Sequence, residues 1–166
     1  MNVWRLIITH ERDPAPMLRW AMKSGCLAIG WGLIGSITDN RYYSSQDISN
    51  AIRENYPHLN NAGHGGASLY NFCYKVHPGD LVILSKNGKR YVVMEVDEGD
   101  YEFDSTSEKP PSGDYQHQRK ASVLPINADK LWQVTGAAPI AGHNLYWTFC
   151  KCQKPIDEKM KAALME

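Results

Sequence analysis

The stretch LVILSKNGKRYVVMEV, residues 81–96, holds two apolar runs separated by Asn87 and Gly88. Both runs contain β-branched residues and have the length of ordinary strands. Asn-Gly is strongly favoured in two-residue hairpin turns, because both residues tolerate a positive φ. The stretch therefore predicts an antiparallel hairpin with strands at 81–85 and 90–96.

On the N-terminal side of this hairpin, strands alternate with helices. Pro14 and Pro16 suit the first turn of a helix, and Gly25 suits the position after a helix end. Ser45 or Asp47 is expected to cap a second helix. In chain order the expected elements are a strand at 3–10, a helix ending at residue 23, a strand at 26–32, a loop at 38–43, a helix ending before Pro57, a flexible loop at 60–66 and a helix at 67–76.

On the C-terminal side the pattern is mostly strands and loops. Residues 104–115 are rich in Ser, Pro, Gly and charge, which predicts an exposed, mobile loop. The other expected elements are a turn at 98–100, a strand beginning at 101–103, a strand at 119–125, a strand or short helix at 131–134, a closing strand at 145–152 and a helix at 155–165. This order predicts an α+β fold, in which a curved, mostly antiparallel sheet or small open barrel is flanked by helices. We expect a single domain over 1–166, with its core at about 3–152.

Composition narrows the class of protein. The chain has 18 Lys plus Arg and 18 Asp plus Glu, so its formal net charge is zero. Binding to polyanions by bulk charge is therefore disfavoured, although a local basic patch remains open. The four cysteines lack the spacing of a zinc or redox pair, so we expect core thiols, no metal and no cofactor. No secretory signal pattern or apolar span is visible, so we expect a cytoplasmic protein with no membrane partner.

The aromatic residues suggest a binding slot. Trp31 lies between Gly30 and Gly32, and glycines let a flat ligand approach the backbone closely. Tyr70 and Tyr74 lie on the helix face opposite the apolar residues of their segment. An aromatic slot of this kind can hold an extruded nucleobase. The alternative for each aromatic residue is ordinary packing in the core.

Basic residues near these aromatics are candidates for contacts with phosphates, which position a nucleic acid without reading its sequence. The alternative is that they are solvated surface charges. The candidates are Arg41, Lys86, Lys89, Arg90, His117, Arg119 and Lys120.

No catalytic signature stands out. The chain has neither a G-x-S-x-G nucleophile turn nor a G-x-x-x-x-G-K-[ST] phosphate loop. Acidic residues gather between Asp97 and Asp104, which leaves a small nucleic-acid-processing enzyme as an alternative. Solvated hairpin acids give the same pattern, and we do not expect an enzyme.

Four segments in order carry a family resemblance: GCLAIGWGLIGSI (25–37), KVHPGDLVILSKNGK (75–89), VVMEVDEGDYEF (92–103) and HQRKASVLPI (117–126). Together they resemble the EVE-type members of the PUA-like superfamily, in particular the modified-DNA-sensing domains joined to restriction endonucleases. The resemblance covers roughly Trp4 to Trp132. It implies a curved sheet with a pocket for one flipped base.

The resemblance also implies roles for particular residues. Trp31 would be a wall of the base pocket, and the pocket candidates together are Trp31, Gly30, Gly32, Tyr70, Tyr74, Asp100, Tyr101 and Phe103. His117 and Arg119 match the histidine and arginine that the family carries after the loop. The implied function is non-catalytic reading of methylated or hydroxymethylated cytosine, or methyladenine, in DNA.

The expected partners are modified DNA and a fused or separate nuclease or NTPase. Three alternatives remain open at this point. An RNA-binding PUA-like module would use the same pocket, a small enzyme would use the acidic residues, and a protein-interaction domain would keep every aromatic in its core.

Overall fold

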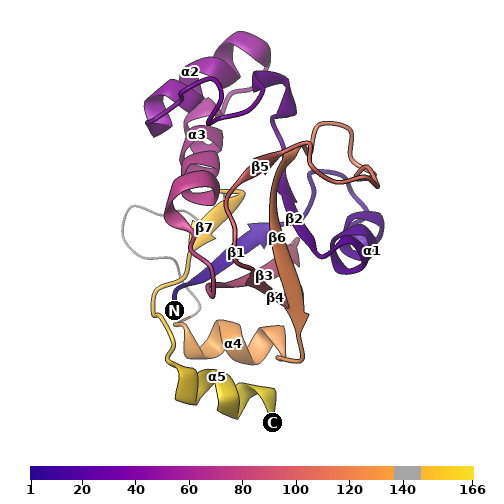
Figure 1. Cartoon of the computed structure of the whole chain (residues 1–166), viewed down its shortest axis with the longest axis vertical. Helices are drawn as coiled ribbons and strands as arrows, with labels where there is room; N and C mark the ends of the chain where they lie inside the picture. Colours follow the sequence, from indigo (N-terminus) through magenta and orange to yellow (C-terminus); the bar gives the residue numbers. More distant parts are fainter. Residues whose placement is uncertain (137–146) are drawn as a thin grey trace.

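The computed structural model describes residues 1–136 and 147–166. It confirms the α+β fold, with a curled, half-open sheet flanked by helices (Figure 1). The strand order is β2-β6-β4-β3-β1-β7, with β5 beside β6, and every pairing is antiparallel except that of β1 with β3. The strands are β1 (Val3–Ile7), β2 (Cys26–Ile29), β3 (Leu81–Lys86), β4 (Lys89–Val96), β5 (Glu102–Phe103), β6 (His117–Leu124) and β7 (Phe149–Lys151).

Helices cover both ends of this sheet. In Figure 1, α2 and α3 lie together at one end of the molecule, α1 lies at one side, and α4 and α5 lie at the opposite end. The helices are α1 (Ala15–Ser24), α2 (Ser45–Asn55), α3 (Ala62–Tyr70), α4 (Ala128–Val134) and α5 (Glu158–Met165), with a 3₁₀ turn at Gly32–Ile34 and a π-helical turn at Asn71–Lys75. No helix in the described ranges is long and apolar enough to cross a membrane.

The central hairpin forms as predicted. Asn87 (φ 52°) and Gly88 (φ 77°) both take left-handed backbone conformations, and Lys86 pairs with Lys89 across the turn. This is the geometry in which a two-residue turn matches the twist of the flanking strands. The β3–β4 hairpin therefore follows directly from local turn chemistry.

The curl of the sheet comes from β6. Its first half pairs with β2, with Ile29 opposite His117, and its second half pairs with β4, with Val96 opposite Ala121. Figure 1 shows β6 running from the α2 end of the molecule to the α4 end. Strand β6 therefore pairs with both β2 and β4 and connects the two parts of the curled sheet.

Strand β3 separates two hydrophobic cores. Val82 and Leu84 pack in the core that also contains buried residues of α1, α2 and α3. Leu81 and Ile83 pack in the second core, under α4 and near α5. Successive side chains of a strand point to opposite faces. Because both faces of β3 are covered, its sequence is a continuous apolar run.

Several predicted element boundaries were wrong: the strand expected at 3–10, for example, ends at Ile7. The strand expected at 26–32 ends at Ile29, and the loop expected at 60–66 is helical from Ala62 onward. Ser44, rather than Ser45 or Asp47, caps α2 by accepting a hydrogen bond from the backbone N–H of Asp47. Of the closing strand expected at 145–152, β7 covers 149–151, and 145–146 lie outside the described residues.

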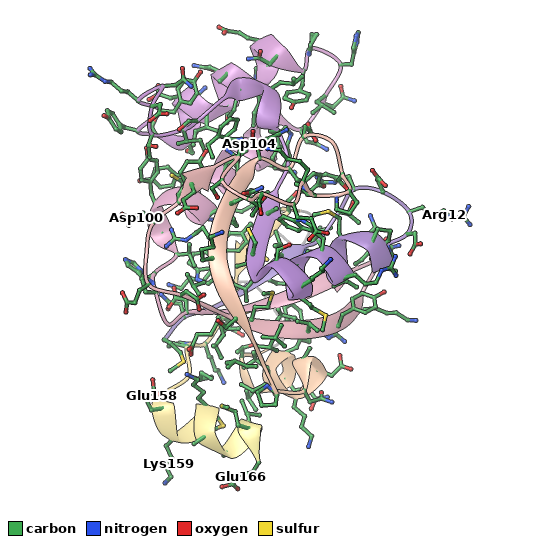
Figure 2. All side chains as sticks on the ribbon, turned by 45° about the vertical axis from the view of Figure 1, so that its right-hand side comes forward. Arg12, Asp100, Asp104, Glu158, Lys159 and Glu166 are labelled. Carbon is green, nitrogen blue, oxygen red and sulfur yellow. The ribbon has the colours of Figure 1, made fainter. Side chains whose placement is uncertain are left out.

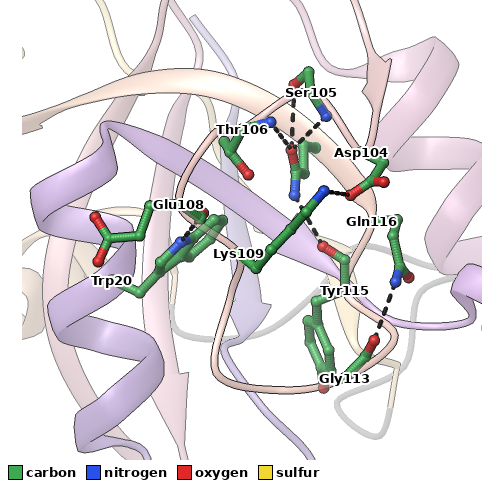
Figure 3. A network of polar contacts seen from close by, with 10 residues as sticks. Trp20, Asp104, Ser105, Thr106, Glu108, Lys109, Gly113, Tyr115 and Gln116 are labelled. Carbon is green, nitrogen blue, oxygen red and sulfur yellow. Dashed lines mark hydrogen bonds and ion pairs between the residues drawn. The ribbon is translucent and has the colours of Figure 1, made fainter.

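The segment 104–115 is a loop, but it is not wholly exposed. Thr106, Ser112 and Tyr115 are buried in it. Figure 3 shows the polar contacts that fasten it, among them the bond from the indole N–H of Trp20 to the carbonyl of Glu108, 2.9 Å long. The loop therefore packs over α1 and the start of β6. All four cysteines are free and buried, as expected of core thiols.

Candidate nucleic-acid interface

Trp31 has an unusual backbone conformation. It lies between the end of β2 and the 3₁₀ turn, with φ 64° and ψ 36°. A side chain with a Cβ pays roughly 1–2 kcal/mol in this left-handed region. Such residues persist only where their surroundings hold them, and they concentrate at functional sites. The tryptophan, and neither of its glycine neighbours, thus carries the strained conformation.

A chain of three hydrogen bonds fixes the backbone of Trp31. The N–H of Ile37 donates to the Tyr101 hydroxyl oxygen (3.2 Å), which lies 2.6 Å from Nδ1 of His117. Nε2 of His117 lies 3.0 Å from the carbonyl oxygen of Trp31. A carbonyl can only accept, so Nε2 carries the proton and Nδ1 accepts from the Tyr101 hydroxyl. Every group in this chain therefore has a defined role.

The imidazole of His117 is neutral in this arrangement. Burial lowers its pKa to about 4, against the smaller raising effects of the Trp31 carbonyl and of Asp114. The ring stacks on Tyr101, with centroids 5.7 Å apart, and meets the edge of Phe103 at 5.3 Å. His117 is thus a buried clamp that joins β6 to the turn after β2.

The indole of Trp31 is partly buried between two segments that are distant in sequence. A Cβ on Gly65 of α3 would lie 3.1 Å from the indole atoms Cε2 and Cζ2, so the helix backbone lies directly against the ring. The His10 ring meets the indole at 65°, with centroids 5.7 Å apart. As a residue, Trp31 keeps part of its surface accessible to solvent. An accessible indole on a fixed backbone can stack on a flat ligand.

The glycines beside Trp31 do not border an open pocket. A Cβ on Gly32 would lie 1.6 Å from Oε1 of Gln116 and 2.8 Å from the carbonyl oxygen of Asp114. That same carbonyl accepts a hydrogen bond from the Gly32 N–H, 2.9 Å long. The nearest atoms to a Cβ on Gly30 belong to the Tyr115 ring, at 3.7 Å. The space predicted to receive a base beside Gly30 and Gly32 is filled by the loop 113–116.

The other aromatic candidates for the pocket fall into two groups. Tyr101 is buried and Phe103 is partly buried. Both rings contact His117, which in turn bonds to the carbonyl oxygen of Trp31. Tyr70 and Tyr74 contact each other (5.3 Å between centroids), and the Tyr74 hydroxyl donates to the carbonyl of Tyr42 (2.7 Å). Burial raises the pKa of Tyr74 to about 12. The structure therefore does not gather all of these aromatics into one slot.

Two of the predicted phosphate contacts are wrong. His117 is fully buried, and Arg119 is 4% exposed. The Arg119 guanidinium donates to the carbonyl of Gly99 at 3.2 Å and to those of Phe72 and Cys73 at 3.5 and 3.4 Å. It ties the π-helical turn to the turn before β5. A phosphate cannot reach either side chain in this conformation.

Three predicted phosphate contacts are exposed. Arg41, Lys89 and Lys120 lie on the surface. Within the described residues none of them forms an ion pair. Exposed cations of this kind can contact phosphates without any rearrangement of the fold.

The two remaining predicted phosphate contacts, Lys86 and Arg90, line a cleft of about 540 Å³. The cleft lies on the α4 side of the sheet, between the end of β1, the tip of the β3–β4 hairpin and α4. Its lining comprises Arg5, Ile7, His10, Ser85, Lys86, Asn87, Gly88, Arg90 and Trp132. None of the eight predicted pocket residues lines it.

The acidic residues do not converge on one point. Asp97 accepts a hydrogen bond from the Ser122 hydroxyl (2.8 Å), and Asp104 pairs with Lys109 (2.6 Å). Figure 2 shows Asp100 at the edge of the molecule, apart from Asp104. Within residues 1–136 and 147–166, no group of three or more His, Cys, Asp or Glu side chains is placed to hold a metal ion.

Comparison with protein families gives a match over most of this chain. The profile of a family described as a domain of unknown function, DUF8426, matches residues 4–128. The chain belongs to the DUF8426 family. Comparison with curated proteins found no match.

The DUF8426 region runs from β1 to the first residue of α4. It contains Trp31, His117 and the two cleft cations of the hairpin, Lys86 and Arg90, whereas Trp132 and β7 lie outside it. The residues that sequence reasoning missed are His10 and Gly65, which flank the indole. A histidine directly after a predicted strand and a glycine in an apparent loop gave little signal, because both become neighbours of Trp31 only through the fold.

Proposed function

We propose that this protein is a non-catalytic reader of a modified base in DNA. The observation that carries the proposal is Trp31, whose partly exposed indole stands on a left-handed backbone that His117 and Tyr101 hold in place. A strained conformation with dedicated buried support favours a functional role for the side chain. The resemblance to EVE-type domains assigns the same residue to the wall of a base pocket.

The energetics suit a single extruded base. Flipping a base out of a duplex costs a few kcal/mol, and stacking on an aromatic side chain returns about 1–3 kcal/mol per base. A methyl group on that base adds about 0.8 kcal/mol when it is buried. An indole in a fixed position turns this added contact into a preference for the modified base.

The stacking surface is the accessible part of the indole, between His10 and the first turn of α3. It differs from the slot beside Gly30 and Gly32, which the loop 113–116 fills. Arg41, Lys89 and Lys120 supply exposed positive charge for contacts with the DNA backbone. Their effect is sequence-independent and weakens as salt rises.

In this proposal the protein recognises DNA and a partner acts on it. A fused or separate nuclease or NTPase would supply cleavage or translocation. The partner would be recruited wherever the modified base is found, as in modification-dependent restriction.

The test is fluorescence anisotropy at low salt with matched duplexes. They contain cytosine, 5-methylcytosine, 5-hydroxymethylcytosine or N6-methyladenine at one position, and a single-stranded RNA of the same sequence is added. Trp31→Ala removes the indole, and Tyr91→Ala removes an exposed aromatic of β4 as the matched control. We expect a preference for one modified duplex that Trp31→Ala abolishes and Tyr91→Ala keeps.

Two results would overturn the proposal. Tighter binding to the RNA than to every duplex would assign the protein to RNA recognition instead. Equal affinity for all duplexes, unchanged in Trp31→Ala, would leave the indole with a packing role alone.

A further inference from the structure

The cleft on the α4 side of the sheet is unusually rich in positive charge for a chain with no net charge. Three of its nine lining residues are Arg or Lys, and none is Asp or Glu. Arg5 reaches it from β1, Lys86 and Arg90 reach it from the hairpin, and α4 contributes Trp132. A concave site with cations on several sides concentrates positive potential and attracts anions.

Lys86 carries the strongest evidence. Its ammonium donates to the backbone carbonyl of Thr9 (2.9 Å), which is a neutral acceptor. Among the described residues it forms no ion pair. An ammonium has three donors. Lys86 is thus held at the cleft by one bond while donors and charge remain for a ligand.

Arg90 is oriented by two neighbours. Its Nε lies 2.6 Å from the Asp129 carboxylate, and its guanidinium carbon lies 5.4 Å from the centre of the Trp132 ring. These contacts use one edge and one face of a planar group that has five N–H donors. The guanidinium is therefore held in place beside the cleft with further donors to offer.

The cleft also adjoins the indole of Trp31. His10 is part of its lining, and the His10 and Trp31 rings meet in an edge-to-face arrangement, with centroids 5.7 Å apart. Burial and then the charge of Lys86 lower the pKa of His10. The His10 imidazole thus connects the indole of Trp31 to the cleft that holds the cations.

We propose that this cleft binds the phosphate of a nucleotide whose base stacks on Trp31. The inference rests on the proposed function and adds a phosphate site to it. The phosphate belongs either to the bound strand or to a free mononucleotide, and the two sources share the chemistry of a phosphate held by Lys86, with Arg90 beside it.

The experiment compares Lys86→Ala with Lys130→Ala. Both remove one positive charge, but Lys130, which is exposed on α4, does not line the cleft. We expect Lys86→Ala to weaken binding of the preferred duplex about tenfold at low salt and to reduce the slope of log K against log [salt] by about 0.9. Lys130→Ala should weaken binding less than threefold. Lys86→Gln and Lys86→Arg, with melting temperatures for each variant, separate loss of charge from loss of folding.

The two sources are distinguished by a second titration. A deoxynucleoside 5′-monophosphate that binds the wild type and not Lys86→Ala assigns the site to free nucleotides. Dependence on Lys86 with the duplex alone assigns it to the bound strand. Equal effects of Lys86→Ala and Lys130→Ala on affinity and slope, with no Lys86-dependent monophosphate binding, would overturn the inference.

The two proposals can fail independently. The proposed function is wrong if the wild type shows no preference for any modified duplex. The cleft proposal is wrong if the two lysine variants have equal effects. A protein that prefers a modified duplex but shows equal lysine variants would keep the first proposal and lose the second.

Discussion

The cluster formed by Trp31, Tyr101 and His117 adjoins the basic cleft through His10. Different kinds of interaction hold the two regions together. The first contains neutral groups in fixed hydrogen bonds, with an imidazole whose pKa burial lowers to about 4. The second gathers cations around an open volume. The comparison shows that a polar residue near a binding surface has two distinct uses, to hold the surface in shape or to contact the ligand. Burial decides between them.

The largest expected effect concerns His117 and pH. Its folded pKa of about 4 lies below the ordinary value of 6.5, so between these values the unfolded chain binds a proton that the folded one does not. The stabilising contribution is fully present above pH 6.5 and is lost as pH falls towards 4, by about 3 kcal/mol in total. Urea unfolding at a series of pH values measures it.

The matched variant is His117→Gln, whose amide keeps a donor and an acceptor but does not titrate. We expect its unfolding free energy to fall less than that of the wild type over the same range. Parallel pH profiles for the two proteins would show that His117 is not the group responsible.

The next effect separates the two glycines beside Trp31. Gly32→Ala would place a Cβ 2.8 Å from the backbone carbonyl oxygen of Asp114, so we expect a loss of about 2 kcal/mol in stability. At Gly30 the nearest atoms lie at ordinary contact distance, so Gly30→Ala should cost under about 1 kcal/mol. Thermal unfolding of both variants tests the assignment, which equal losses would contradict.

A smaller effect tests the strain at Trp31 itself. Trp31→Ala and Trp31→Gly both remove the indole, but only alanine has a Cβ that the left-handed backbone conformation disfavours. We expect the glycine variant to be more stable than the alanine variant by about 1 kcal/mol. Modified-base preference should be absent from both. An alanine variant as stable as the glycine variant would mean that the turn relaxes once the ring is gone.

The smallest expected effect concerns the basic cleft. Asp129→Asn removes the carboxylate paired with Arg90, so we expect about two- to threefold tighter duplex binding and a stability change under about 1 kcal/mol. Glu158→Gln, in the first turn of α5, is the control. Unchanged affinity in Asp129→Asn would show that Arg90 does not face the bound phosphate.

Much of the fold could be predicted from local patterns. The Asn87-Gly88 turn and the glycine after α1 each have a cause within a few residues of themselves. The start of α3 could not be predicted in this way, because glycines normally indicate a loop. Here Gly66 is required since a Cβ would lie 1.9 Å from the Ser49 hydroxyl of α2, a contact between two helices.

The candidate site was predictable only in part. Trp31 could be singled out because its neighbours in sequence are unusual, and Lys86 because hairpin tips carry charge. The inward orientation of His117 and Arg119 could not be foreseen, because it depends on β2, β5 and the π-helical turn covering that part of β6. The same pattern of charged and polar residues would be solvated on an uncovered strand.

Turn chemistry and side-chain periodicity are local, so the 166 residues themselves specify the hairpin, most of the helices and the α+β class. The accessible indole and the basic cleft are not local. They arise at the end of β1, where His10 contacts the indole beside Gly65 of α3 and also lines the cleft with Trp132 of α4, although long stretches of chain separate these residues. Such contacts depend on how the sheet curls and which helix covers each face, which no short segment encodes.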